Sequence, residues 1–166
     1  MSRAVWVVDS SALIQIKSFV PNTLRSPLFA SLTTMVDEGR LVFPLQVLRE
    51  LKRDTATYED EACQWARTVG DHACRHIVPL DCVKDVLAVV PDVLDPMKDS
   101  PVEEADPYVL ALAVLLRRED VDARVVVQEV KDSPKKLSLN TACGILGVPS
   151  VPLLGLLRTE GIKYEV

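Results

Sequence analysis

The segment Val5-Trp6-Val7-Val8-Asp9-Ser10-Ser11 joins a short apolar run to an abrupt polar end, and residues 12–17 then continue in a helical pattern. A continuous apolar run of this kind is typical of a strand that is buried on both faces, as in a parallel sheet. Open α/β sheets bind their ligands in the crevice outside the carboxyl ends of the strands. The segment therefore predicts a parallel α/β fold with Asp9 at the ligand-binding edge of the sheet.

Strand and helix signals alternate along the rest of the chain. Further strands are predicted at 41–43, 77–78, 124–128 and 149–151. Helices are predicted at 22–38, 45–54, 58–75, 81–90, 105–118 and 139–146, with a last one ending near 161, and Asn22 and Asp81 are the predicted caps of two of them. The proline-spaced stretch 91–101 predicts an irregular loop. Strands that are separated by helices imply parallel βαβ units with right-handed crossovers. We therefore expect a parallel sheet of four or five short strands.

Length and composition favour one domain over residues 1–166, with 48% apolar and 26% charged residues. The longest apolar run, 109–116, is far shorter than the ~20 residues of a membrane span. Because the first strand has no signal-peptide pattern before it, we expect a cytoplasmic protein with no membrane segment and with its four cysteines as free thiols. The net charge of −5 argues against broad, charge-driven binding of nucleic acid.

Four carboxylates occupy positions where they could meet in one crevice: Asp9, Glu50, Asp106 and Glu129. Each also has an ordinary explanation. Asp9 and Asp106 can cap helices, Glu50 can pair with Arg53 one turn later, and Glu129 can be the polar end of a strand. Glu129 directly follows the strand predicted at 124–128 and mirrors Asp9. A divalent metal ion is the ligand that four converging carboxylates indicate, because Mg²⁺ prefers oxygen ligands.

The same positions resemble the PIN-domain family. The resemblance is carried by Asp9-Ser10-Ser11 after an apolar strand, by Glu50 in a Leu-Arg-Glu-Leu helix, by residues 104–113 (EADPYVLALA), and by the strand that ends at Glu129. Their order and spacing fit across nearly the whole chain. The tail 137–148 looks like an uncharacterised bacterial branch of that family.

This resemblance implies a three-layer α/β/α sandwich and a metal-dependent endoribonuclease, often the toxin of a VapC-type toxin–antitoxin pair. It implies that the family's metal-binding and catalytic positions fall on four residues: Asp9, Glu50, Asp106 and Glu129. Ser10 and Ser11 fall near the hydroxyl that supports the first aspartate. The implied cofactor is Mg²⁺ or Mn²⁺, and the implied partners are an RNA substrate and a cognate antitoxin. Two positions depart from the common pattern, with Glu129 in place of Asp and Val127 in place of Thr.

Basic residues flank two of the acidic positions. Four of them are candidates for a phosphate-binding rim: Arg53, Lys131, Lys135 and Lys136. A solvated charged face is the ordinary explanation for such runs. The turn 131–136 is the better candidate because it follows Glu129 directly.

Other functions stay open at this point. The chain could be a catalytically weak PIN-like module whose acidic cleft binds an Arg-rich segment of a partner, or a structure-selective DNA nuclease. A homodimer is a further alternative for its oligomeric state. A zinc site around His72, Cys74 and His76 is disfavoured because paired ligands from two segments are missing. Cys63 and Cys74 share the alanine-rich face of a helix, which favours core packing.

Overall fold

A computed structural model describes residues 3–54, 60–95, 104–128 and 131–166, and shows an α/β protein with a four-stranded, all-parallel sheet. The elements along the chain are β1 (Val5–Val8), α1 (Ser10–Ile14), α2 (Ile16–Phe19), α3 (Asn22–Asp37), β2 (Leu41–Val42), α4 (Leu45–Asp54), α5 (Glu61–Ala73), α6 (Leu80–Val89), the 3-10 helix η1 (Pro91–Val93), α7 (Asp106–Arg118), β3 (Ala123–Val126), α8 (Leu139–Leu146), β4 (Ser150–Val151) and α9 (Leu153–Glu160).

The strand order is β2-β1-β3-β4, so the first strand lies at the centre of the sheet. Val8 at the end of β1 pairs with Val126 at the end of β3, which makes the two strands end level with each other. The backbone N–H of Asp9 still donates to the carbonyl of Val126, at 2.9 Å. Asp9 therefore leaves the sheet at its carboxyl edge, beside the exit of β3, as the apolar run predicted.

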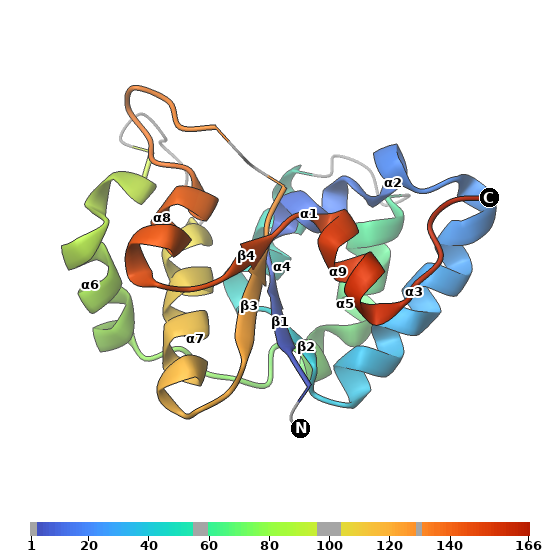
Figure 1. Ribbon diagram of the computed structural model, residues 1–166, viewed down its shortest axis with the longest axis horizontal. Coiled ribbons are helices and arrows are strands. Elements are labelled where there is room, and N and C mark those ends of the chain that lie inside the picture. The colour runs from blue at the N-terminus through green and yellow to red at the C-terminus, as the bar shows by residue number, and fades with distance from the viewer. Residues whose placement is uncertain (1–2, 55–59, 96–103, 129–130) are drawn as a thin grey trace.

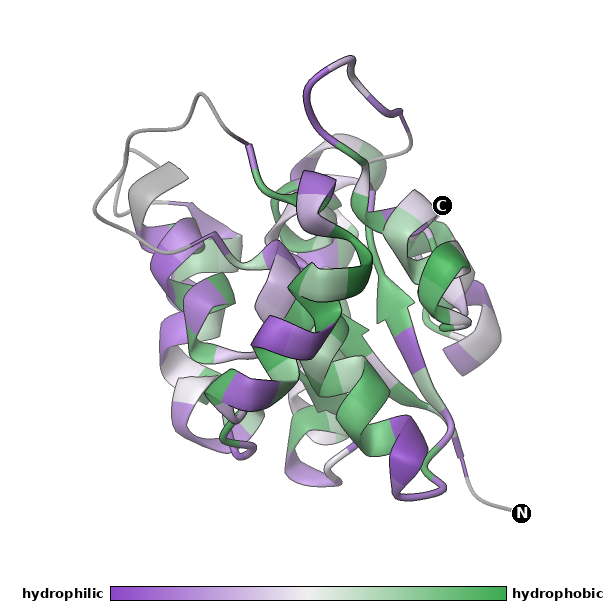
Figure 2. Ribbon diagram, turned by 90° about the vertical axis from the view of Figure 1, so that its left-hand side faces the viewer, coloured by the Kyte–Doolittle hydropathy of each residue, from purple (hydrophilic) through white to green (hydrophobic). Residues whose placement is uncertain are grey.

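Helices cover both faces of the sheet and make three layers (Figure 1). α6, α7 and α8 lie on one side, where α7 contacts β1 and β3. α3, α5 and α9 lie on the other side, where α3 and α5 contact β2. Hydrophobic residues concentrate on the strands and on the helices next to them (Figure 2). The fold is thus the predicted three-layer α/β/α sandwich, with its core between sheet and helices.

The central helix α7 packs against the sheet with apolar residues on nearly every side. Residues 109–113 are all buried, as expected of a helix inside a protein rather than on its surface. Its 13 residues are too few for a bilayer, and none of the other helices in the described ranges is long and apolar enough to cross a membrane. The burial of α7 holds its first turn, which contains Asp106, against the edge of the sheet.

Several local predictions were wrong. Ile77 and Val78 form no strand, since Ile77 is 90% exposed and Pro79 lacks the N–H that a sheet ladder needs. The N-cap positions of α3 and α6 are occupied by the prolines before them, so neither Asn22 nor Asp81 is the cap. The helix predicted at 58–75 is described from Glu61 to Ala73, and Tyr58 lies outside the described residues.

Candidate metal centre

Three of the predicted carboxylates meet at the carboxyl edge of the sheet. Asp9 follows β1, Glu50 lies in α4, and Asp106 is the first residue of α7. Each residue offers one carboxylate oxygen, and these three oxygens lie within 4.8 Å of one another. Asp9 is 3% exposed, and Glu50 and Asp106 are each 8% exposed. The three residues, called the acidic triad below, therefore form a buried cluster of like charges.

Asp9 is held by the first turn of α1, which it caps. Its Oδ2 accepts from the backbone N–H of Ser11 at 3.2 Å and from the Ser11 hydroxyl at 2.6 Å. The same hydroxyl accepts from the backbone N–H of Gln128 at 3.1 Å. Oδ1 of Asp9 is buried and has no hydrogen-bond partner among the described residues. Capping thus uses one oxygen of Asp9, and the other oxygen is left for a ligand.

Glu50 is not the solvated helix residue that its local sequence favoured. It lies beside Val47 and Leu51, which are fully buried, because α4 packs this face against the protein. The hydroxyl of Ser10 is 3.5 Å from Oε1 of Glu50 and donates to it weakly. Both serines after Asp9 therefore contact carboxylates of the acidic triad, Ser11 closely and Ser10 at long range.

Asp106 does not take the capping position that its place before Pro107 suggested. Ala105 holds the N-cap of α7, and Asp106 is the first helical residue. Oδ2 of Asp106 accepts from Nζ of Lys136 at 3.0 Å. This contact brings the turn before α8 onto the acidic triad.

The electrostatics of the triad disfavour three negative charges together. Burial raises the pKa of Asp9 to about 7, and the charges of Asp106 and Glu50 add to the rise, although the Ser11 hydrogen bonds oppose it. The neighbouring Cys143 thiol has a pKa of about 12, raised first by burial and then by the charges of Asp9 and Asp106. Cys143 is therefore a neutral thiol at physiological pH, which leaves carboxylate oxygens as the anionic donors of the site.

The donor set and its spacing fit a small divalent cation. Mg²⁺ binds oxygen ligands at about 2.0–2.1 Å, so two ligands on opposite sides of the ion are about 4.2 Å apart. The triad oxygens, within 4.8 Å of one another, are near that span without large movement. The unpartnered Oδ1 of Asp9 is an acceptor that such an ion would satisfy. The residues present therefore fit Mg²⁺ or Mn²⁺.

The remaining predicted site residues fall into two groups. Glu129 and the side chain of Arg53 lie outside the described residues. Lys131 and Lys135 are exposed, whereas Lys136 reaches the acidic triad. Sequence reasoning missed Gln128, which holds Ser11 through its N–H and accepts from the backbone N–H of Leu153 at 3.1 Å. Its place at the carboxyl end of the strand predicted at 124–128 was the signal, because strand ends line this edge, although β3 itself already ends at Val126.

The zinc alternative has no support in the described ranges, where the acidic triad is the one group of three or more metal-ligating side chains close enough to share an ion. Cys63 is buried in the helix α5, as predicted, and His72 lies 3.4 Å from Asp37. All four cysteines are free thiols.

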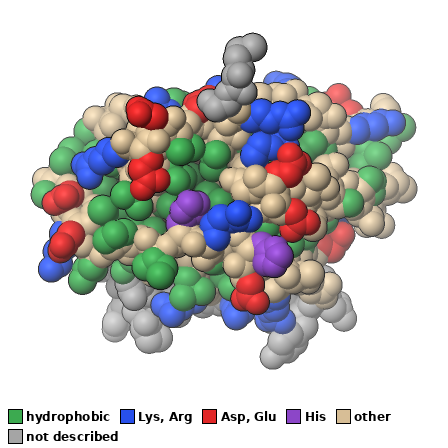
Figure 3. Space-filling view, turned by 90° about the horizontal axis from the view of Figure 1, so that it is seen from below, with side chains coloured by type: hydrophobic (Ala, Val, Ile, Leu, Met, Phe, Trp, Pro, Cys, Tyr) green, Lys and Arg blue, Asp and Glu red, His purple; other side chains and the backbone are tan. Residues whose placement is uncertain are grey.

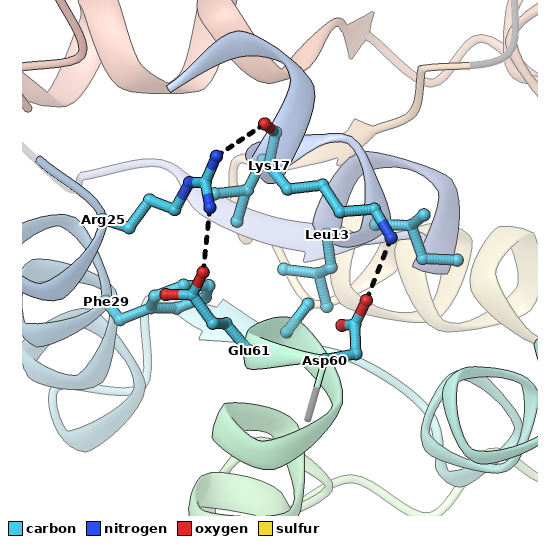
Figure 4. A pocket seen from close by; sticks show the side chains of 9 residues that line it. Leu13, Lys17, Arg25, Phe29, Asp60 and Glu61 are labelled. Carbon is cyan, nitrogen blue, oxygen red and sulfur yellow. Dashed lines mark hydrogen bonds and ion pairs between the residues drawn. The ribbon is translucent and has the colours of Figure 1, made fainter. Parts of the chain in front are cut away.

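A separate pocket lies between α1, α2, α3 and the start of α5 (Figure 4). Leu13 and Phe29 contribute apolar wall, and each cation on the rim is paired with an acid. The two ion pairs are Lys17 with Asp60, at 3.1 Å, and Arg25 with Glu61, at 3.0 Å. Because its charges are already matched, this pocket has no excess positive charge for a phosphate.

Fold and site together define an α/β/α sandwich protein with a buried acidic triad at the carboxyl edge of a parallel sheet. Residues 6–164 match the family model described as Domain of unknown function (DUF4411), so the chain belongs to the DUF4411 family. The comparison with curated proteins found no match.

Proposed function

We propose that this protein is a metal-dependent endoribonuclease of the PIN type. The observation that carries the proposal is the convergence of Asp9, Glu50 and Asp106 within 4.8 Å of one another, in the chain order that the PIN resemblance implies. The acidic triad contains no imidazole or thiolate, so hydrolysis of a phosphodiester is a better match than a reaction that needs a nucleophilic side chain.

The carboxylates of the site have different roles in binding the cation. Asp9 is the principal cation ligand, since Oδ1 is unpartnered while Oδ2 is oriented by Ser11. Glu50 and Asp106 complete the oxygen donor set from α4 and α7. A divalent cation held there lowers the pKa of bound water and balances charge on the phosphate. Glu129, outside the described residues, is the expected ligand for a second ion.

The hydroxyl of Ser11 orients the carboxylate of Asp9. Ser11 Oγ connects the carboxylate of Asp9 to the backbone of Gln128, so the ends of β1 and β3 are linked through one hydroxyl. Such outer contacts set the direction of a metal ligand and typically change metal affinity about 10–100-fold when they are removed. The expected products carry a 5′-phosphate, which is the outcome that the PIN resemblance implies.

The experiment is cleavage of a mixed RNA pool by purified protein with Mg²⁺ or Mn²⁺, beside Asp9→Asn and an EDTA control. Glu160→Gln is the matched control, because it removes an acidic charge from the opposite edge of the sheet. The proposal predicts cutting that needs the metal, is lost in Asp9→Asn and persists in Glu160→Gln. Cutting that survives both EDTA and Asp9→Asn would contradict it. Flap DNA in a parallel assay distinguishes a DNA nuclease.

A second candidate function is a protein-binding module whose acidic cleft takes cationic side chains of a partner. The contact between Lys136 Nζ and Asp106 favours it, because the acidic triad already accepts one ammonium group from its own chain. Metal-dependent cleavage by the isolated protein separates the two functions. The toxin role rests on the PIN resemblance, and growth arrest on induced expression, relieved by Asp9→Asn, is its test.

A further inference from the structure

Lys136 differs from the other lysines of its turn. Lys131 and Lys135 are exposed, whereas the Lys136 side chain is 25% exposed and its Nζ lies 3.0 Å from Oδ2 of Asp106. A solvated basic turn, the ordinary explanation for residues 131–136, leaves this inward contact unexplained. Lys136 therefore has a different environment from the two exposed lysines of the turn.

The fold aims Lys136 at the acidic triad through a backbone that is anchored on both sides. Its N–H donates to Oγ of Ser133 at 3.0 Å, and its carbonyl accepts from the N–H of Ser133 at 2.9 Å. The next residue, Leu137, donates to the carbonyl of Asp92 at 2.7 Å, and Ser138 then caps α8. The position of the Lys136 Cα is thus set by η1 and α8, and the long side chain crosses from there to Asp106.

The chemistry of an ammonium group suits a phosphate at this place. Lysine carries a compact charge on a flexible stem, and it binds phosphate oxygens as a point charge. In the protein without metal, Lys136 balances part of the charge of three buried carboxylates. A divalent cation on the triad adds two positive charges, which weakens the attraction between Asp106 and Lys136. A phosphate at the cation can then replace Asp106 as a partner of the same ammonium group.

We propose, resting on the nuclease function above, that Lys136 binds the scissile phosphate of RNA beside the cation held by Asp9, Glu50 and Asp106. Lys131 and Lys135 have no part in this contact. Before substrate binds, Lys136 is a counter-ion that competes with the metal for Asp106. Loss of its charge therefore has two opposite effects, tighter metal binding and weaker RNA binding. General damage to the site would instead weaken both.

The test compares Lys136→Met, which keeps the stem and removes the charge, with Lys163→Met, at an exposed lysine after α9, and with Lys136→Arg. Calorimetric titration measures Mn²⁺ affinity, and fluorescence anisotropy measures binding of a labelled RNA oligonucleotide with Ca²⁺ in place of Mg²⁺. One charge-assisted hydrogen bond corresponds to roughly a 10- to 100-fold change. We expect Lys136→Met to weaken RNA binding about 10-fold and kcat/KM for cleavage about 100-fold, and to bind Mn²⁺ at least as tightly as wild type.

Lys163→Met should stay within about 2-fold of wild type in all three measurements, because Lys163 is exposed and follows Ile162, which lies beside Arg40 and Glu160 at the opposite edge of the sheet. Lys136→Arg should recover most of the RNA binding because it retains the charge. Equal RNA binding and cleavage by Lys136→Met and Lys163→Met, with an active wild type, would overturn the role of Lys136 alone. Parallel loss of Mn²⁺ and RNA binding in Lys136→Met would overturn it as well. A wild type that neither binds Mn²⁺ nor cuts RNA would reject the nuclease function itself, and this role with it.

Discussion

Acidic side chains have opposite surroundings at the two edges of the parallel sheet. At the carboxyl edge, three carboxylates crowd together and Lys136 contacts one of them. At the amino edge, Glu160 accepts from Nη1 of Arg40 at 2.6 Å and from the indole N–H of Trp6 at 3.1 Å. Figure 3 shows the molecule from below, with Lys and Arg side chains lying next to Asp and Glu. Acidic groups at the amino edge have their counter-charges within the fold.

The pKa values follow the same division. At the amino edge, burial raises the pKa of Glu160, but the hydrogen bonds from Arg40 and Trp6 outweigh it and the pKa is lowered. At the carboxyl edge, burial and neighbouring carboxylates raise the pKa of Asp9 to about 7. The negative charge of Glu160 is therefore balanced by partners within the fold. The negative charge of Asp9 lies among other carboxylates, and buried like charges of this kind are typical of functional sites.

The largest effect that separates the edges concerns metal affinity. Asp9→Asn removes a charge and one carboxylate oxygen from the acidic triad, so Mn²⁺ affinity should fall by at least about 100-fold, because contacts one shell further out already change affinity 10–100-fold. Glu160→Gln should leave Mn²⁺ affinity within about 2-fold, since Glu160 belongs to the amino edge. Isothermal titration calorimetry measures both. An equal loss in the two variants would remove the distinction between the edges.

A pH series on metal-free protein tests the charge crowding directly. The pKa of Asp9 lies near 7 in the folded chain and near 3.9 in an unfolded one, so between pH 4 and 7 the folded state binds more protons. The free energy of unfolding should therefore fall as pH rises through this range, by a few kcal/mol at most. Urea denaturation measures the trend. Asp9→Asn should flatten it and should raise stability at pH 8, and an identical slope in the variant would contradict the assignment.

A substitution at the amino edge should change the free energy of unfolding, whereas a substitution at the carboxyl edge should change metal affinity. Glu160→Gln weakens the ion pair with Arg40, and both side chains are mostly buried, with 16% and 13% of their surface exposed. Loss of one partner in such a pair should cost about 1–3 kcal/mol of unfolding free energy, less than a fully buried pair because some water reaches it. Thermal and urea denaturation at pH 8 measure it. Stability equal to that of wild type would show that the pair is solvated.

The smallest effect concerns the orientation of Asp9. Ser11→Ala removes the 2.6 Å hydrogen bond to Oδ2 and the acceptor for the Gln128 N–H. We expect about a 10-fold loss of Mn²⁺ affinity and about 1 kcal/mol of stability. Thr68→Ala is the control, because its hydroxyl donates within α5 to the carbonyl of Gln64, away from the acidic triad. Unchanged Mn²⁺ affinity in Ser11→Ala would make the hydroxyl a purely structural cap.

The elements with strong local signals were predictable from the sequence. β1 is confirmed as an apolar strand with Asp9 at its end, α4 and α8 have the predicted bounds, and α7 is the buried helix. The pair Ile77 and Val78 misled because β-branched residues mark a strand only where a neighbouring strand supplies partners. Pro79 and the exposure of Ile77 show that none does so there.

For the site, the sequence by itself determined where carboxylates follow strands and start helices, because apolar periodicity and capping are local properties of the chain. Only the tertiary structure decided which of them act together. Glu50 and Asp106 each had an adequate local explanation, as a solvated helix residue and as a helix cap, but Glu50 is buried and Ala105 holds the N-cap of α7. They lie within 4.8 Å of Asp9 because α4 and α7 pack against the same edge of the sheet, and Lys136 reaches Asp106 because η1 and α8 anchor its turn. Helix packing depends on long-range burial of apolar faces, and no short window of sequence contains that information.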